Sequence, residues 1–263
     1  SSPRRHTPRR DPMPEFLIFR LYGPLAAWGD IAVGERRGSY SRPSKSAVLG
    51  LVAAALGIDR NDDDAHRALD GGYGFAVRVD APGVPIRDFH TAQVPSQRRG
   101  KTWPTRHAEL AEEQLNTIVS ARDYYADALY TVALWPREAA AYSLEALKAA
   151  LDWPHYHLYL GRRSCPPALP LGAEIVSAPG LVAAFEAAGF PASDLIRRLY
   201  PRQPAAALLA WDPDAPGDRP VETRRIMLRD GIASRTRRQF ASRSEAIGAV
   251  PNRVDGGTRR GGA

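Results

Sequence analysis

The sequence is almost free of cysteine, since Cys165 is the only one among 263 residues. A single thiol cannot form an internal disulfide or a cluster of thiolates around a metal, and this composition is typical of a reducing cytoplasm. Because Cys165 stands alone between Ser164 and Pro166, we interpret it as inert packing rather than as a nucleophile.

Long apolar runs are also missing. No window approaches the eighteen or so consecutive apolar residues of a membrane-spanning helix. The first ten residues are rich in Arg and Pro, and no apolar segment with a cleavage site follows them, so we expect no secretory signal. The hydrophobic content of 44% is ample for a buried core. We therefore expect a soluble cytoplasmic protein without a membrane partner.

Motifs for nucleotide and metal chemistry are absent as well. The sequence contains no Walker motif, no GxGxxG and no GxSxG, so nucleotide cofactors and acyl transfer have no support. Three aspartates at 62–64 begin a predicted helix, but no second acidic cluster or HExxH pattern stands beside them. We expect neither a cofactor nor a bound metal.

Positive charge is concentrated at the two ends of the chain. Residues 219–263 contain eleven Arg against four Asp or Glu, and residues 1–11 contain four Arg against one Asp. The net charge of +7 therefore leaves −3 for residues 12–218. This distribution indicates polyanion binding, and a pair of solvated basic tails explains it equally well.

Short apolar segments punctuated by Gly and Pro predict an α+β fold. The predicted elements are strands at 15–22, about 75–79, 126–135 and 155–161, and helices at about 43–56, 61–72 and 143–151. Their order is that of the ferredoxin-like split βαβ plan, an antiparallel sheet with both main helices on one face.

One insertion departs from that plan. Residues 86–125 lie between the second and third predicted strands, are mostly polar, and are too long for an idle loop, so we expect them to project from the sheet. After Pro170 the pattern predicts only a short helix near 181–188, a strand at 205–211 and a basic end.

These features divide the chain into three regions. We expect a disordered extension at 1–12, a ferredoxin-like domain at 13–172 that contains the insertion, and a small β-rich basic region at 173–263.

The loop after the first strand, GPLAAWG, is the first candidate for nucleic-acid binding. Gly23 and Gly29 let backbone amides approach an anion, and the indole of Trp28 offers a stacking face to a base. A turn with a core tryptophan is the alternative, and the sequence leaves both interpretations open.

Cations and hydroxyls gather around the start of the first predicted helix. A helix N-terminus with free N–H groups, hydroxyls and a cation is a ready phosphate site, and ordinary capping is compatible with that role. The candidate residues are Arg36, Arg37, Arg42, Ser44, Lys45 and Ser46.

Two further clusters lie later in the chain. Arg162 and Arg163, in GRRSCPP, follow the fourth predicted strand and can reach phosphates, although such pairs are also common on solvated surfaces. The segment 224–243 interleaves arginines with Ile226, Leu228 and Phe240, as in a half-buried strand with a charged face.

A metal-independent endoribonuclease is the competing hypothesis. In such an enzyme a His, often with Lys or Tyr, removes the 2′-hydroxyl proton so that the RNA attacks its own phosphodiester. The residues that could do this, all within the insertion, are His90, Lys101, His107 and Tyr124.

Five segments together resemble a known family. In chain order they are LIFRLYGPLAAWG, RPSKSAVLGLVAAALGI, RVDAPGVPIRDFHTAQ, DYYADALYTVALW and HYHLYLGRRSCPPALPL. They resemble the CasD subunits of type I-E CRISPR Cascade complexes, which belong to the RAMP superfamily. The resemblance covers about residues 15–172, and the C-terminal third matches loosely through RDGIASRTRRQFASR.

The resemblance implies a RAMP fold whose protruding thumb is the insertion at 86–125, and a non-catalytic role in antiviral defence. Members of this family bind the 5′ handle of the guide RNA, cap the filament of backbone subunits beside the large subunit, and meet target DNA only through the complex. By position, the handle would be faced by the 23–29 loop, by Arg36 and Arg37, and by the helix start at 42–46. The thumb would contribute Arg98, Arg99, Lys101 and Trp103.

Overall fold

A computed structural model describes residues 13–29, 32, 34–96, 100–189, 206–237 and 239–251. Its largest sheet has seven strands in the order β10-β1-β9-β6-β11-β13-β12, and every neighbouring pair is antiparallel. The strands are β1 (Glu15–Tyr22), β6 (Tyr73–Ala81), β9 (Leu129–Pro136), β10 (Glu174–Ser177), β11 (Ala206–Trp211), β12 (Arg224–Ser234) and β13 (Gln239–Pro251).

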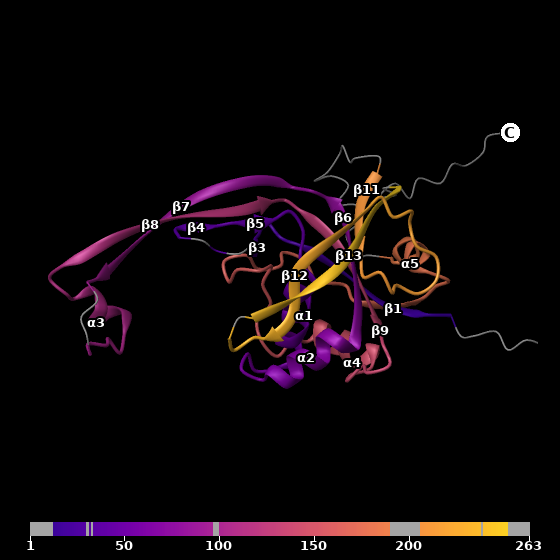
Figure 1. The fold of residues 1–263 in the computed structure, drawn as a ribbon, viewed down its shortest axis with the longest axis horizontal. Helices are drawn as coiled ribbons and strands as arrows, with labels where there is room; N and C mark the ends of the chain where they lie inside the picture. The colour runs from indigo at the N-terminus through magenta and orange to yellow at the C-terminus, as the bar shows by residue number, and fades with distance from the viewer. Residues whose placement is uncertain are drawn as a thin grey trace, which may run out of the picture.

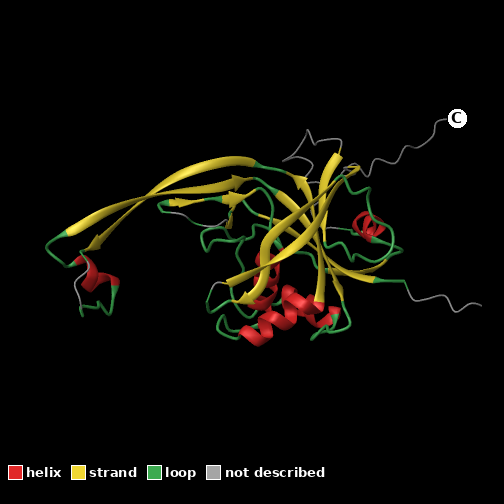
Figure 2. Cartoon of the chain, viewed as in Figure 1, coloured by secondary structure: helices red, strands yellow, loops and turns green. Residues whose placement is uncertain are grey.

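Three helices cover one face of this sheet, and a fourth lies against the other (Figures 1 and 2). The covered face carries α1 (Lys45–Leu56), α2 (Asp63–Gly72) and α4 (Leu144–Asp152), and the opposite face carries α5 (Leu181–Ala187). None of the helices in the described ranges is long and apolar enough to cross a membrane.

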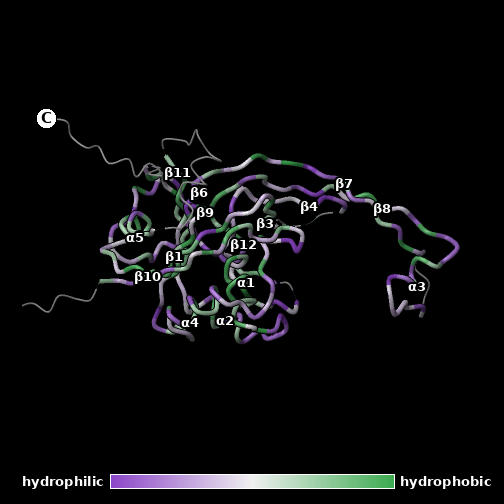
Figure 3. The backbone as a smooth tube through the Cα atoms, turned by 180° about the vertical axis from the view of Figure 1, so that it is seen from behind, coloured by the Kyte–Doolittle hydropathy of each residue, from purple (hydrophilic) through white to green (hydrophobic). Residues whose placement is uncertain are grey.

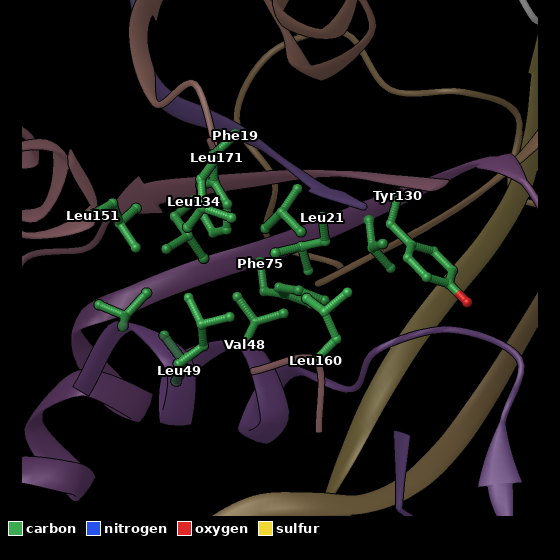
Figure 4. Close-up of a cluster of buried hydrophobic side chains, with 14 of the residues drawn as sticks. Phe19, Leu21, Val48, Leu49, Phe75, Tyr130, Leu134, Leu151, Leu160 and Leu171 are labelled. Atoms are coloured by element: carbon green, nitrogen blue, oxygen red, sulfur yellow. The ribbon is translucent and has the colours of Figure 1, made fainter. Parts of the chain in front are cut away.

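The central strands are buried on both faces, which explains why they read as continuous apolar runs. In β1, Leu17, Phe19 and Leu21 pack in the larger core beneath α1, while Phe16 and Ile18 pack in the smaller core beneath α5. Figure 4 shows the larger core, where side chains of β1, β6 and β9 meet those of α1. Each such buried side chain contributes about 1.5–3 kcal/mol of transfer free energy.

Local chemistry sets the ends of α1. The Ser44 hydroxyl accepts the Ala47 amide at 3.3 Å and caps the first turn. Gly57, at φ +78°, ends the helix in the left-handed conformation that glycine adopts most readily. The predicted strand at 15–22 is confirmed, and the predicted helices begin within two residues of α1, α2 and α4.

The predicted strand at 155–161 is wrong. The amides of His155 and Tyr156 donate to the carbonyls of Ala55 and Ala54 at 2.9 and 3.1 Å, so this segment caps the C-terminal end of α1 instead of pairing with a strand. Leu158 is half-buried, Tyr159 is exposed and Leu160 is fully buried, which accounts for the strand-like alternation in the sequence. The strand that pairs with β1 in the position predicted for residues 155–161 is β10.

The insertion forms a long hairpin that extends away from the main sheet (Figure 1). Its strands, β7 (Val84–Pro95) and β8 (Leu115–Ala126), pair over twelve residues each, a length of roughly 40 Å at strand spacing. The short helix α3 (Arg106–Leu110) lies at the tip, which is mainly hydrophilic in Figure 3.

Four two-residue strands join the base of the hairpin to the start of the chain. β2 (Leu25–Ala26) pairs antiparallel with β8, and β4 (Arg36–Arg37) pairs parallel with β8. β3 (Trp28–Gly29) pairs with β5 (Ser39–Tyr40). The loop that follows β1 is therefore fastened beneath the hairpin.

Candidate nucleic-acid interface

A groove runs along the surface of α1, from its N-terminal end to the residues that follow its C-terminal end. It consists of two adjoining cavities of about 570 and 370 Å³ that share four lining residues, namely Gly29, Ser44, Ser46 and Phe240. We call this feature the α1 groove. It brings together the loop after β1, the start of α1, the turn between β12 and β13, and the 156–161 loop.

Hydroxyl groups form the floor of the groove where the two cavities meet. The Oγ atoms of Ser44 and Ser46 lie 3.2 Å apart. The Lys45 amide donates to Asp230 Oδ2 at 3.1 Å, and the Ala47 amide is capped by Ser44. Two amides of the first turn are thus already paired, so hydroxyls are the main polar groups that this turn offers to a ligand.

Gly29 is the residue of the 23–29 loop that faces the groove. It is exposed, and a Cβ atom added to it would have open space within 4 Å. Gly23 is buried instead, where a Cβ would lie 2.7 Å from the Pro166 carbonyl oxygen. Close packing, rather than an approaching anion, explains the glycine at position 23.

Trp28 belongs to the core, so the interpretation of its indole as an exposed stacking face is wrong. Its side chain is 2% exposed, and its ring meets the Tyr130 ring edge to face at 5.7 Å. The indole buries a large apolar surface between the loop and the sheet.

Lys45 is also unavailable as a surface cation. Its ammonium donates to Asp212 Oδ2 at 3.1 Å and to the Asp70 carbonyl at 2.9 Å, and the residue is 2% exposed. Burial lowers the pKa of Lys45, and the Asp212 carboxylate opposes that shift. The expectation that Lys45 meets a phosphate is therefore wrong.

A buried charge network surrounds this ammonium. Arg243 contacts Asp212, donates to Asp230 at 2.8 and 3.0 Å and donates to Glu245 at 2.9 Å, and Arg42 also pairs with Glu245. Burial raises the pKa of Glu245, and the two guanidinium groups counteract it. Arg42 is thus engaged with a carboxylate of β13, although it also lines the groove.

Arg36 and Arg37 are exposed on β4 beside the hairpin base. Arg36 forms an ion pair of 3.3 Å with Asp123, and its side chain remains 67% exposed. Asp123 also accepts from Arg87 at 2.7 Å, and these two arginines lower the pKa of Asp123, Arg87 contributing most. Both residues of β4 can still face a polyanion.

Arg162 and Arg163 differ in their surroundings. Arg162 lies 4.6 Å above the Tyr124 ring and donates to the carbonyls of Asp123 at 3.1 Å and Arg37 at 2.8 Å. It therefore connects the 161–167 loop to β8 and β4. Arg163 is exposed and lines a separate cavity of about 1070 Å³ beside the 154–159 loop.

The thumb candidates lie at the hairpin tip or outside the described residues. Arg98 and Arg99 are outside the described residues. Lys101 pairs with Glu112, which also accepts the Trp103 indole N–H at 2.9 Å, and the Lys101 ammonium lies 5.6 Å from the Trp103 ring centroid. These contacts stabilise the tip.

The four ribonuclease candidates are not brought together. Tyr124 pairs with Ile86 near the hairpin base, while His90 pairs with Ser120, about 13 Å farther along β8 at strand spacing. The other two are near the tip, where His107 lies on α3. No shared centre for proton transfer is formed by these side chains.

Sequence reasoning missed the residues at the inner end of the groove. They are Arg60, His66 and Tyr159, which come from three separate parts of the chain. Arg235 also lies there and belongs to the 224–243 segment, but it stands in the turn between β12 and β13 and not on the charged face of a strand. His66 is a lone histidine in a short helix, and no sequence motif around it indicates a binding site. Nothing in the sequence indicates that the β12–β13 turn folds back onto α1.

Comparison with known proteins adds a family match. The family described as CRISPR-associated protein (Cas_Cas5) matches residues 16–248, from β1 into β13. The CRISPR system Cascade subunit CasD of Escherichia coli (strain K12) is 37% identical over 167 residues, which cover 60% of this chain and 70% of that protein.

Two solved structures are similar over nearly the whole chain. One, described as a CRISPR RNA-guided surveillance complex, has a TM-score of 0.60 at 30% identity and covers 90% of this chain and 89% of its own. Another, described as the crystal structure of a Cas protein, has a TM-score of 0.56 at 29% identity, and the match covers 91% of this chain and 96% of that one.

Proposed function

Because this chain belongs to the Cas5 family of CRISPR-associated proteins, we propose that it is a non-catalytic subunit of a Cascade complex that binds the 5′ handle of the guide RNA in the α1 groove. Its place is in antiviral defence.

The α1 groove is the observation that carries this proposal. It combines hydroxyls at the start of α1 with exposed arginines on its rim, which are Arg60, Arg224 and Arg229. Single-stranded RNA is bound by cations that follow its backbone and by aromatic side chains on which its bases stack, and Tyr159 and Phe240 also line the groove. Binding should therefore weaken steeply as salt increases.

The topology supports the RAMP assignment. The four strands β10-β1-β9-β6 with α1 and α4 follow the ferredoxin-like order, in which the last strand lies beside the first. We infer that the β7–β8 hairpin is the thumb. The strands β11, β13 and β12 extend the same sheet and supply one wall of the groove.

Exposed apolar side chains support protein partners along the hairpin. Val84 is 63% exposed and Phe89 66% exposed, and Ile86, Ile118 and Val119 are also exposed. By the register of the hairpin, Phe89 and Val119 lie on one face and Val84, Ile86 and Ile118 on the other, so each face offers apolar contacts to a partner. We infer that the backbone subunit and the large subunit cover parts of the hairpin, and that target DNA is met only through the complex.

The test incubates the full chain with end-labelled CRISPR repeat RNA, with and without EDTA, and compares native with denaturing gels. A shifted but intact RNA is expected. A discrete EDTA-resistant cut would instead support the metal-independent endoribonuclease, and loss of that cut in His90→Ala or His107→Ala would locate its centre. Co-purification with the backbone subunit separates the Cascade role from a free-standing RNA-binding protein.

A further inference from the structure

A separate cavity of about 1070 Å³ lies beside the α1 groove. We call it the proline cavity, because Pro154, Pro166, Pro167 and Pro170 line it. The 156–159 loop is its common wall with the α1 groove, since all four residues of that loop line both cavities. An occupant of the proline cavity therefore sits next to whatever fills the groove.

The charge of the proline cavity differs from that of the α1 groove. Among Asp, Glu, Lys and Arg side chains, the cavity lining holds one of each sign, Asp152 and Arg163. With its two histidines, His155 and His157, neutral, the cavity has no net charge. The lining of the α1 groove instead contains five arginines and two aspartates. A polyanion gains little from a surface without excess positive charge, so the proline cavity is a poor site for RNA.

The walls of the proline cavity are apolar and stiff. Four leucines line it together with the prolines, namely Leu151, Leu158, Leu169 and Leu171. Each proline has a fixed φ and no backbone N–H, so this wall offers few donors to a phosphate or to a base edge. A preformed apolar surface loses little entropy when a partner packs on it. These properties match the core of a protein–protein interface, where charged residues are depleted.

Three exposed aromatic side chains stand at or beside the proline cavity. Trp153 is 88% exposed, the highest fraction among the large apolar side chains of the described residues, and its neighbours Asp152 and Pro154 both line the cavity. Tyr156 and Tyr159, in the shared wall, are 46% and 44% exposed. Covering such rings with a partner removes a large apolar surface from water. Trp and Tyr are among the side chains that most often anchor protein interfaces.

We propose that the proline cavity is a docking surface for an apolar segment of a neighbouring protein subunit, with Trp153 as the anchor. The segment is uncharged where it enters the cavity, because a buried charge would find no excess of counter-charge there. None of the lining residues belongs to the β7–β8 hairpin, so this surface is separate from the apolar faces of the hairpin. The inference rests on the proposed function, because it places a protein subunit against the loop whose other side faces the RNA.

The first experiment places the photoreactive residue p-benzoylphenylalanine at position 153, in a complex co-expressed with the guide RNA and the other Cascade subunits. Irradiation should link this position to one protein subunit, and mass spectrometry of the digest should identify an apolar peptide of that subunit. Glu145 is the control position, because it is exposed in the first turn of α4, at the other end of the helix from Trp153, and should give much less product. A link to the RNA, or no link in the assembled complex, would overturn the inference.

The second experiment uses the sign of an added charge to separate an apolar partner from a polyanion. Leu169 is half-buried in the lining of the proline cavity and does not line the α1 groove. Complexes with Leu169→Lys or Leu169→Glu should both lose the linked subunit on dilution at about tenfold higher concentration than the unsubstituted complex, as measured by mass photometry. The affinity of the full chain alone for the guide RNA should change by less than about twofold in either variant.

Thermal unfolding shows whether each variant is folded, and Trp153→Ala, at an exposed position, replaces the Leu169 variants in the dilution assay if they are not. Opposite effects of Leu169→Lys and Leu169→Glu would assign the cavity to the RNA and overturn the inference. If the complex assembles on the guide RNA and the folded variants retain every subunit, the docking surface is overturned while the proposed function stands. If the unsubstituted chain neither binds the guide RNA nor joins a complex, both proposals fail together.

Discussion

The Lys45 ammonium lies 3.1 Å from Asp212 Oδ2, and both residues are 2% exposed. This pair joins Lys45, in the first turn of α1, to Asp212, which follows β11. The two residues are 167 positions apart in the sequence. Arg137 also contacts Asp212 at 2.9 Å. The C-terminal strands are thereby fixed against the helix whose N-terminus forms the groove.

Lys45→Met should be destabilising, because it removes one of the cations around the buried Asp212 carboxylate and the donor to the Asp70 carbonyl. Since Arg137 and Arg243 still pair with Asp212, the cost should be about 1–3 kcal/mol. Urea denaturation followed by circular dichroism measures the loss in free energy of unfolding. Lys148→Met is the matched control, since the exposed Lys148–Asp152 pair should contribute less than about 1 kcal/mol. Equal effects of the two substitutions would contradict the buried network.

The elements that could be predicted from the sequence are those whose ends carry their own chemistry. Ser44 and Gly57 mark both ends of α1, and the apolar run of β1 stops before Gly23. The 155–161 segment resembles a strand because Leu158 and Leu160 alternate with polar residues, but the amides of His155 and Tyr156 bond to the end of α1 and Leu160 bonds to Cys165 and Ala27. Period-two burial alone does not distinguish a strand from a loop that packs on a helix.

The candidate site was only partly predictable, for a similar reason. The helix start and Gly29 carry local signals, and they do line the groove. Whether Lys45 faces solvent depends on Asp212, which is brought close only by the pairing of β11 with β6. Contacts between residues so distant in the chain leave no mark on local periodicity.

Asp63 should make the stability of the fold depend on pH in the acid range. Hydrogen bonds from Ser234 and from the Thr236 and Arg235 amides lower the pKa of Asp63 from its ordinary 3.8 to about 2. Since the folded-state pKa is the lower one, this stabilisation is present above pH 3.8 and is lost as the pH falls toward 2. The difference in free energy of unfolding between the unsubstituted chain and Asp63→Asn should therefore shrink over that interval.

Carboxyl ¹³C chemical shifts followed by NMR provide the direct measurement of this titration. Ser234→Ala removes the donor with the largest effect and should move the midpoint of Asp63 upward toward 3.8. A midpoint near 3.8 in the unsubstituted chain would show that the β12–β13 turn does not bind this carboxylate.

Gly161→Ala should destabilise the protein much more than Gly100→Ala. Both glycines have positive φ, +86° and +79°, so alanine costs about 1–2 kcal/mol at either position from backbone strain. At Gly161 a Cβ would also lie 1.9 Å from the Ala27 carbonyl oxygen, whereas at Gly100 it meets open space. Thermal unfolding of the two variants tests this difference, and a similar loss in Tm for both would refute the close packing of the 161–167 loop on the 23–29 loop.

Arg162 and Arg163 are neighbours in the chain, yet their substitution should have different effects. Arg163 is exposed, so Arg163→Ala should leave stability unchanged and weaken RNA binding through the loss of one phosphate contact. One phosphate contact to single-stranded RNA corresponds to about 0.7 in the slope of log affinity against log salt. Anisotropy titrations over a range of salt concentrations would measure that change.

Arg162→Ala should act mainly through the fold. It removes a cation–π contact with Tyr124 and the hydrogen bonds to the Asp123 and Arg37 carbonyls, which together hold β4 and the hairpin base against the 161–167 loop. We expect a loss of about 1–3 kcal/mol in stability, because two carbonyls lose a charged donor. RNA affinity should fall with little change in the salt slope, since the lost cation already has protein partners. A slope change as large as that of Arg163→Ala, with unchanged stability, would assign Arg162 to the RNA instead.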